Sequence, residues 1–392
     1  MKTYEEWSKI FASQDLYQFN LCESGVLWLK IKSLTRNEIL DFMQQKLGFK
    51  LTSKTQAQKF KEIYNLVLDN KITQQQIDFV LSQYSKDEIK ALEKDFGFIE
   101  SELYKMDYFA WGGDSSNSLD KQIVSFVKEI CKYDDILCKL DNDIAQNVKN
   151  YTLSSWYNNW TTILTEHIFK SHPKVISAVG KIKSVDFFIQ NIPIDLKITY
   201  FPKEFLKAQR KMRGLQNELT LLKNIAKIHS FAFDKECKED IIKYQITQQI
   251  LDSNDDLVIS KFDELKRQNT EIIQSTMANK HTLIKWLYEN QGEMRFGSEN
   301  RIFIVPIDLD DFTQAWKLKR NFKLIKPKIL DYLAPMRGFL MSLRGRLSKS
   351  RMISRHIFLN LPWESIFFWV IKAITSFFHF SCNSSVDPAT AS

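Results

Sequence analysis

The segment from Val185 to Tyr200 limits the fold of this chain more than any other stretch. Residues 185–190 and 194–200 are rich in β-branched and aromatic side chains, and Asn191-Ile192-Pro193 lies between them. Such residues favour strands, and a short polar connection between two of these runs favours a hairpin. We therefore predict two antiparallel strands joined by a tight turn, in a chain whose other segments mostly carry helix signals.

Helix signals are frequent in residues 1–110. Three pairs fit capping boxes, in which a hydroxyl residue precedes Glu or Gln by three positions: Thr35 with Glu38, Thr73 with Gln76, and Ser85 with Glu88. A short strand is expected over residues 27–31. These signals predict an N-terminal, mostly helical domain, for which a packing or oligomerisation role and a DNA-contacting role both stay open.

A second domain is predicted over residues 111–333. It begins at the loop-forming run 111–118, which contains Gly112 and Gly113. Helices are expected over 119–133, 137–150 and 156–170, followed by the hairpin, a mostly helical region to residue 253 and a strand over 301–307. A basic helical stretch over 312–333, kinked at Pro327, ends the domain. The fold class is α/β, more specifically α+β, with a small mixed sheet flanked by helices.

The basic charge of the chain is concentrated at its C-terminal end. The formal net charge is +8, but residues 334–392 hold seven Lys and Arg against two acids and so carry +5 of it. The remaining +3, spread over residues 1–333, says little about a polyanionic partner. Any nucleic-acid partner would therefore need a local basic surface.

Residues 334–392 differ from the rest of the sequence, because a basic run is followed by the strongly apolar stretch 357–382. Pro362, Glu364 and Lys372 interrupt that stretch and count against a membrane-spanning helix. Three interpretations stay open: a membrane or interfacial segment, a packing helix, or a sequence foreign to the fold, such as a frameshifted or fused end. A membrane partner is not expected.

The five cysteines show no metal-ligand spacing and are odd in number. Reduced thiols in the cytoplasm explain this pattern better than a disulfide framework or a zinc module. The N-terminal residues place acids where a signal peptide would have its apolar stretch, so we expect a cytoplasmic protein.

The second predicted strand carries an acid and a lysine on one face. Side chains alternate along a strand, so Asp195 and Lys197 oppose the apolar face made by Ile194 and Leu196. Asp186 of the first strand joins them only if the turn has an even number of residues or contains a bulge, because a one-residue slip reverses the faces. A two-residue turn at 191–192 would set Asp186 opposite Lys197 and diagonal to Asp195.

Two carboxylates and an amine at one place suit metal-assisted phosphate chemistry. Carboxylate oxygens are hard ligands that suit Mg²⁺, which lowers the pKa of a bound water and offsets charge on a phosphate. A lysine nearby can orient or deprotonate that water and stabilise an oxyanion. Glu166 lies at the edge of the apolar stripe of the preceding helix, from which its carboxylate can lean toward the hairpin.

A helix with Glu166, a strand with Val185-Asp186 and a strand with Asp195-Leu196-Lys197 together resemble the PD-(D/E)xK nuclease superfamily, in particular its type II restriction endonucleases. The resemblance covers residues 150–205, with Val185 in place of the proline. It implies a restriction-endonuclease-like core and Mg²⁺-dependent hydrolysis of double-stranded DNA at a specific site. Asp186 and Asp195 would bind the metal, Lys197 would serve the water, and Glu166 would be an accessory acid and metal ligand.

Other repair or defence nucleases use the same residue types, and a non-catalytic DNA-binding or scaffold protein with a degenerate core stays open. A palindromic target would favour a homodimer. Basic residues follow the catalytic strand and are expected to contact DNA phosphates, although a solvated helix face explains them equally well. These residues are Lys203, Lys207, Arg210, Lys211 and Arg213, and a second basic cluster lies within residues 317–328.

Overall fold

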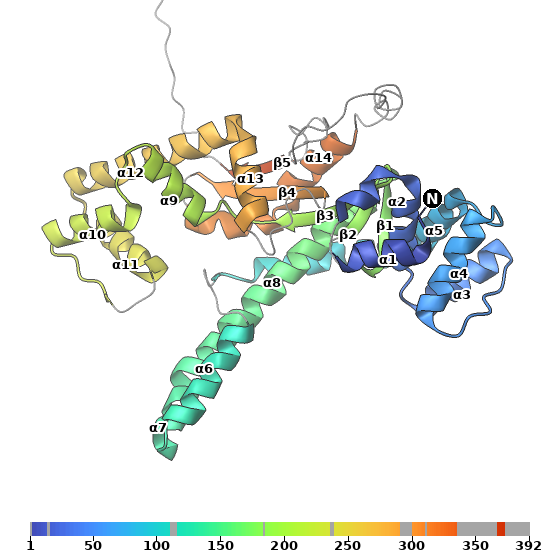
Figure 1. Ribbon diagram of the computed structural model, residues 1–392. Helices are drawn as coiled ribbons and strands as arrows, with labels where there is room; N and C mark the ends of the chain where they lie inside the picture. The colour runs from blue at the N-terminus through green and yellow to red at the C-terminus, as the bar shows by residue number, and fades with distance from the viewer. Residues whose placement is uncertain are drawn as a thin grey trace, which may run out of the picture.

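The chain is described here from a computed structural model. It covers residues 2–13, 16–109, 116–182, 185–235, 239–290, 300–309, 312–334 and 367–372. The fold is α+β, mostly helical with a small mixed sheet near the middle of the molecule, as Figure 1 shows. The expected fold class is confirmed at this level.

The sheet follows chain order, β1-β2-β3-β4-β5. The strands are β1 (Val175–Ile182), β2 (Val185–Ile189), β3 (Ile192–Ile198), β4 (Asn300–Asp308) and β5 (Phe367–Lys372). The first three pair antiparallel, whereas β3–β4 and β4–β5 pair parallel. The predicted hairpin and the strand at 301–307 are confirmed, and β1 was not foreseen from the sequence.

The β2–β3 turn consists of Gln190 and Asn191, which both have positive φ, 49° and 69°. Positive φ at both central residues is the geometry of a two-residue type I′ hairpin turn. The turn therefore has an even number of residues, but it begins one residue earlier than the predicted 191–192. The reason is steric, because asparagine tolerates the left-handed region and the β-branched Ile192 does not.

The N-terminal segment is helical, as expected. It contains α1 (Tyr4–Ala12), the 3₁₀ helix η1 (Leu16–Leu21), α2 (Glu23–Lys32), α3 (Asn37–Leu47), α4 (Gln56–Leu68) and α5 (Gln74–Tyr104).

Some local expectations for this segment were wrong. Residues 27–31 lie inside α2 rather than in a strand. The capping box of Thr73 with Gln76 is present, whereas α3 lacks a side-chain cap and Ser85 lies inside α5. A further capping box, Thr55 with Gln58, begins α4. The apolar face that residues 27–31 present is buried by tertiary packing, which overrides strand propensity.

The N-terminal helices and the sheet share one hydrophobic core. Val179 and Ile182 of β1 and Val185 and Phe188 of β2 are buried in the same cluster as residues of α1 to α5. Figure 1 shows these helices lying against the β1–β2 end of the sheet. The predicted boundary near residue 110 therefore separates segments of sequence but not hydrophobic cores.

Lys30 ties the helices to the hairpin turn. Its side chain is fully buried, and its Nζ donates to Asp78 Oδ1 at 2.5 Å and to Asn191 Oδ1 at 2.6 Å. Burial lowers the pKa of Lys30, and the carboxylate of Asp78 opposes that shift. A buried amine thus joins α2 and α5 to the residue that sets the register of β2 and β3.

The other helices surround the sheet. Helix α8 (Ala145–Lys170) packs with α14 (Phe322–Leu333) against one face, through Leu164, Phe187, Ile194 and Ile302 among others. On the opposite face, α9 (Lys203–Met212), α12 (Asp256–Ala278) and α13 (Lys280–Asn290) cover β4. Helices α10 (Glu218–Ile228) and α11 (Glu239–Asp252) pack with α12 into a separate lobe.

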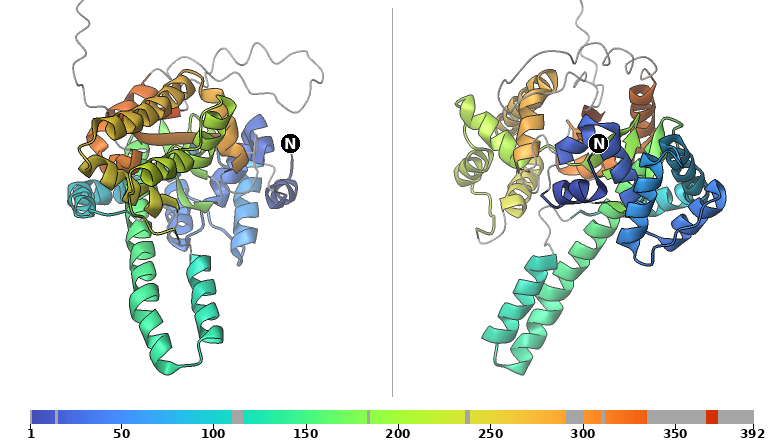
Figure 2. Two further views of the ribbon diagram at one scale, coloured as in Figure 1. Left: turned by 90° about the vertical axis from the view of Figure 1, so that its left-hand side faces the viewer. Right: turned by 45° about the vertical axis from the view of Figure 1, so that its right-hand side comes forward.

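A helical arm projects from the body. It is made by α6 (Ser116–Glu129), α7 (Tyr133–Lys139), the π-helical segment η2 (Leu140–Ile144) and the first part of α8. Figure 2 shows this hairpin standing clear of the rest of the molecule in both views. The predicted break at 111–118 falls largely outside the described residues, and α6 begins at Ser116.

The end of the chain returns to the sheet. Residues 312–333 form the 3₁₀ helix η3 (Phe312–Arg320) and α14, with Pro327 inside α14. In the tail, residues 367–372 form β5 beside β4, so a packing helix is wrong for these residues. The rest of the basic and apolar tail lies outside the described residues. In the described part of the chain, no helix is long and apolar enough to span a membrane.

We expect Lys30→Met to lower the free energy of unfolding by about 3 kcal/mol, because it leaves the carboxylate of Asp78 without its buried cation. The double variant Lys30→Met/Asp78→Leu should recover most of that loss. The control is Lys61→Met, since the Lys61–Glu5 pair is about half exposed and is screened by solvent, so that its loss should have a much smaller effect. Urea denaturation measures the free energy of unfolding of all three variants. Equal losses of stability for Lys30→Met and Lys61→Met would contradict the buried structural role of Lys30.

Candidate active site

Asp195 and Lys197 lie on the same face of β3, as the alternation predicts. The Asp195 side chain is buried, with 4% exposure, whereas that of Lys197 is 44% exposed. Lys197 Nζ donates to Asp195 Oδ1 at 2.7 Å. The strand therefore holds a fixed carboxylate next to an amine that reaches toward solvent.

Arg301 is a site residue that sequence reasoning missed. It pairs with Asp195 across the parallel β3–β4 ladder, and its Nε donates to Asp195 Oδ2 at 3.0 Å. Both side chains of this ion pair are buried. The strand over 301–307 was predicted, but its pairing with β3 depends on a contact between residues more than one hundred positions apart. No local signal specifies that contact.

Asp186 joins the same face. The ladder pairs Phe187 with Ile194, so continuing it by one residue sets Asp186 opposite Asp195. The even register that the site requires is therefore present. The expected placement of Asp186 opposite Lys197 was wrong by two positions, because the turn begins one residue earlier. Asp186 Oδ2 accepts the backbone N–H of Leu196 at 2.7 Å.

Glu166 projects from α8 near this strand pair. Its Oε2 accepts from Lys170 Nζ at 2.6 Å, one helical turn further along α8, and both side chains are partly buried. Lys170 was also missed, although its spacing of four from Glu166 is a local signal for an ion pair.

Glu166, Asp195 and Lys197 all lie close enough to Asp186 to influence its pKa. Burial, with a smaller contribution from the negative charges of Glu166 and Asp195, raises this pKa to about 6. The Leu196 N–H and the positive charge of Lys197 act in the opposite direction. Such interactions require proximity, so Glu166, Asp186, Asp195 and Lys197 belong to one cluster.

The sheet face that carries Asp186, Asp195 and Lys197 is covered by helices on two sides of these residues. Phe188, two residues beyond Asp186 on β2, is buried against the N-terminal helices. Phe303, which pairs with Lys197, is buried against α9 and α13. Lys197 is partly exposed between these two covered regions, whereas the Asp195 side chain beside it is buried.

The donor set of the cluster suits a hard divalent cation, since Mg²⁺ is commonly held by one or two carboxylates and several waters. Among the described residues, no three or more His, Cys, Asp or Glu side chains are grouped closely enough to surround a metal. Lys197 and Arg301 occupy the two oxygens of Asp195. A cation shared by Asp186 and Asp195 therefore requires Lys197 to release Asp195.

The basic residues after β3 differ in their availability. Lys203 and Lys211 are exposed on α9, and Lys207 is paired with Glu204 and Glu239. Arg210 is buried and donates to Gln216 O, Asn269 Oδ1 and Gln268 Oε1, so it fastens α9 to α12 and cannot serve as a surface contact to DNA. Arg213 lies at the end of α9 and donates to Ser275 Oγ.

Two members of the later basic cluster are also internal. Lys319 is buried, donates to Asn158 Oδ1 at 2.9 Å and lies over the Tyr200 ring; burial lowers its pKa to about 7. Arg320 donates to the carbonyls of Leu103 and Met106. Their apolar surroundings, which only the tertiary structure creates, make them structural.

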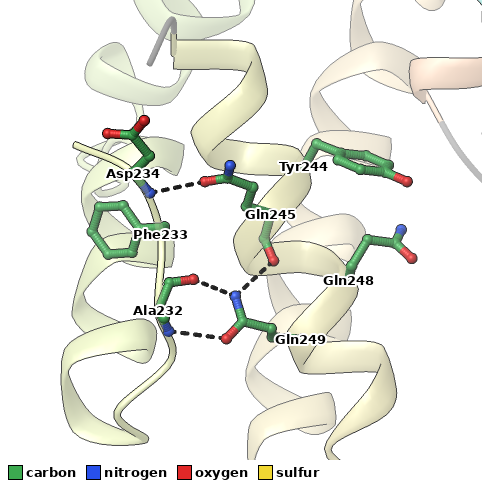
Figure 3. A pocket seen from close by; sticks show the side chains of 7 residues that line it. All are labelled: Ala232, Phe233, Asp234, Tyr244, Gln245, Gln248 and Gln249. Carbon is green, nitrogen blue, oxygen red and sulfur yellow. Dashed lines mark hydrogen bonds between the residues drawn. The ribbon is translucent and has the colours of Figure 1, made fainter. Parts of the chain in front are cut away.

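A shallow hollow lies elsewhere, on the lobe of α10 and α11 (Figure 3). Gln245 and Gln249 use their amides to hold the backbone of Ala232 and Asp234 beside α11. The hollow takes no residue from β2, β3 or α8, so it is separate from the acid cluster. Its lining residues are Ala232, Phe233, Asp234, Tyr244, Gln245, Gln248 and Gln249.

No family model, curated protein or solved structure matches this chain. The geometry of the acid cluster therefore supplies the functional argument by itself.

We expect Asp186→Asn to stabilise the protein at high pH. The folded-state pKa of Asp186 lies above that of the unfolded chain, so ionisation opposes folding as pH rises from about 4 through about 6. The variant should gain about 2–3 kcal/mol above pH 7, given about 1.4 kcal/mol per pKa unit, and little near pH 4. Its amide oxygen can still accept the Leu196 N–H.

Denaturation of wild type and Asp186→Asn at pH 4.5, 6 and 8, without divalent cations, measures this difference. If Asp186→Asn were more stable than wild type by the same amount at all three pH values, the raised pKa of Asp186 would be contradicted. If the variant were less stable than wild type at pH 8, the Asp186 carboxylate would have a stabilising partner in the fold.

Proposed function

We propose that this chain is a Mg²⁺-dependent endonuclease of the PD-(D/E)xK type that hydrolyses DNA phosphodiester bonds. The observation that carries the proposal is that Glu166, Asp195 and Lys197 all lie close enough to Asp186 to act on its pKa, with Lys197 partly exposed to solvent. Burial and the negative charges of Glu166 and Asp195 raise the pKa of Asp186, and a bound cation would favour its ionised form.

Each residue has a role in the proposed reaction. Asp186 and Asp195 would hold the cation, with Glu166 as a further acid, and a bound Mg²⁺ supplies a water of lowered pKa and offsets phosphate charge. Lys197, the exposed member of the cluster, would bring Nζ to the phosphate oxygens or to the attacking water. In hydrolysis the water oxygen bonds to phosphorus and the ester P–O bond breaks.

Arg301 is a positioning residue in this scheme. Its buried Nε holds Asp195 Oδ2, which orients the carboxylate after Lys197 has moved away. Arg301 also offsets part of the negative charge of the buried Asp195.

Double-stranded DNA is the proposed substrate, and α9 supplies part of its contact surface. Phe205 of α9 packs against the sheet face that carries Phe303, the pairing partner of Lys197. The exposed Lys203 and Lys211 therefore belong to a helix that lies beside the acid cluster. Cutting at a specific site, as in type II restriction enzymes, is the narrower form of the proposal, and repair or other defence nucleases are its alternative.

A non-catalytic DNA-binding or scaffold protein is the second candidate. The contacts of Asp195 favour it, because both carboxylate oxygens are already engaged by cations of the chain. In this case the cluster is a network of ion pairs that stabilises the β3–β4 pairing. DNA binding that persists without cutting would distinguish it from a nuclease.

We expect wild-type protein to cut plasmid DNA with Mg²⁺ and not with EDTA. Lys197→Ala should lower the rate about 100-fold or more, as removal of a group that stabilises transition-state charge does. Lys61→Ala, on the exposed face of α4, should cut at the wild-type rate. Gel assays should use supercoiled, linear and single-stranded DNA, because the preferred form is not fixed by the site.

Mg²⁺ binding gives a second readout that is independent of cutting. Millimolar Mg²⁺ should raise the thermal midpoint of wild type at pH 8 more than that of Asp186→Asn/Asp195→Asn, because a ligand that binds the folded state stabilises it. Intact DNA across the whole panel, together with no Mg²⁺ shift, would refute the nuclease proposal.

We expect Lys203→Ala/Lys211→Ala to weaken DNA binding about equally for all sequences. Loss of two phosphate contacts should reduce the slope of log affinity against log salt by about 2. Fluorescence anisotropy at several salt concentrations, in Ca²⁺ to prevent cutting, measures the slope. An unchanged slope would place the DNA surface away from α9, and Lys61→Ala is a control that removes one positive charge from α4.

A further inference from the structure

The helical arm exposes apolar side chains that its own two helices cannot cover. Within the described part of the arm, the buried apolar residues on its seam are Leu119 and Ile144. Asn147 of α8 donates to Gln122 of α6 at 3.0 Å, which marks the line along which the helices meet. Apolar side chains with 39% to 74% exposure remain on α6, α7, η2 and α8: Ile123, Val124, Val127, Tyr133, Leu137, Leu140, Val148 and Leu153.

Several of these side chains share one face. Ile123 and Val148 each follow a seam residue, Gln122 or Asn147, by one position. In two antiparallel right-handed helices, the residue after a seam position turns toward the same side of the pair. Val127 lies one turn beyond Ile123 on that flank. Ile123, Val127 and Val148 therefore form a continuous apolar strip, which we call the arm face.

We propose that the arm face is a dimerisation surface on which the arm of a second copy of this chain packs in antiparallel orientation, giving a four-helix bundle. In a single arm, each of the two helices leaves one apolar face exposed to solvent. In a bundle of two arms, the four helices bury these faces in a common core. Figures 1 and 2 show the arm clear of the body, so that a second arm can lie along it. The two-fold axis would pass near the middle of α6.

The size of the arm suits this partner. The hairpin from Ser116 to its tip spans 18 residues, about 27 Å at 1.5 Å per residue, and two packed helices are about 20 Å wide. The face then covers about 500 Å² per copy and about 1,000 Å² per pair, which is the lower range of specific interfaces.

The charges of the arm favour a second copy over DNA. The tip, residues 128–143, has five acids and three lysines, whereas the remaining arm residues, 116–127 and 144–155, have one acid and two lysines. Antiparallel packing brings each acidic tip toward the weakly basic root of the other arm. The same acidic tip would repel the phosphates of nucleic acid.

The test compares two single substitutions on α8. Val148 is 41% exposed and Leu153 is 43% exposed, but Leu153 lies about 140° further round the helix at 100° per residue. Sedimentation equilibrium of the full chain at 1–100 µM, without DNA or metal, should give a dimer for wild type and Leu153→Asp. Val148→Asp should weaken the dimer at least 30-fold, because it places two carboxylates in the bundle core.

A cross-link provides a second measurement. In a Cys131→Ser/Cys138→Ser background, Ile123→Cys should form an intermolecular disulfide in wild-type-like dimers, because it lies near the proposed axis. Leu153→Cys in the same background should form little intermolecular disulfide. Circular dichroism establishes that each variant is folded before it is compared.

Three outcomes would overturn the proposal. They are a wild-type monomer at 100 µM, a dimer that Val148→Asp leaves intact, and equal weakening by Val148→Asp and Leu153→Asp. Because mass is measured without DNA, failure here leaves the nuclease proposal standing, and absence of DNA cutting leaves the dimer standing.

Discussion

The register of the β2–β3 hairpin is the constraint on which the candidate site depends. Strand side chains alternate between faces, so Asp186 and Asp195 share a face only when an even number of residues separates the strands. Gln190 and Asn191 supply that number by both adopting positive φ. Lys30, buried in the N-terminal helices, donates to the Asn191 side chain and so holds the turn from the outside.

That contact gives the N-terminal helices a structural part in the site. Their core includes Phe188 of β2, which shares a strand face with Asp186 and so fixes this strand on the side away from α8. On the opposite side, α8 packs against Phe187 and Ile194 through the second core. The hairpin is thus held between two hydrophobic cores, while Lys197 at its polar face stays partly exposed.

The three acids of the site have different charged partners. Lys170 pairs with Glu166, and Asp195 contacts both Lys197 and Arg301. Asp186 accepts the backbone N–H of Leu196, and burial together with the negative charges of Glu166 and Asp195 raises the pKa of Asp186 to about 6. Without a bound cation, the charges of such a cluster lower the stability of the folded protein. A site of this kind gives up folding stability for the ability to bind a cation.

The sequence by itself determined the elements with strong local patterns. Alternation along 194–198 placed Asp195 and Lys197 on one face, and the β-branched runs specified the hairpin and β4. The turn position was missed by one residue, although the β-branched Ile192 was a signal against positive φ. The internal, structural roles of Arg210, Lys319 and Arg320 could not be predicted, because the sequence around a basic residue does not specify whether its side chain is solvated or buried.

Only the tertiary structure decided which residues surround Asp195 and which surfaces remain open. Arg301 reaches Asp195 because β4 pairs parallel with β3, across a separation of 106 residues. The arm face is apparent only once α6 and α8 are seen to pack on each other. Local propensity sets the period of a segment, whereas contacts between distant segments depend on how the hydrophobic faces are buried together, which no short stretch of sequence encodes.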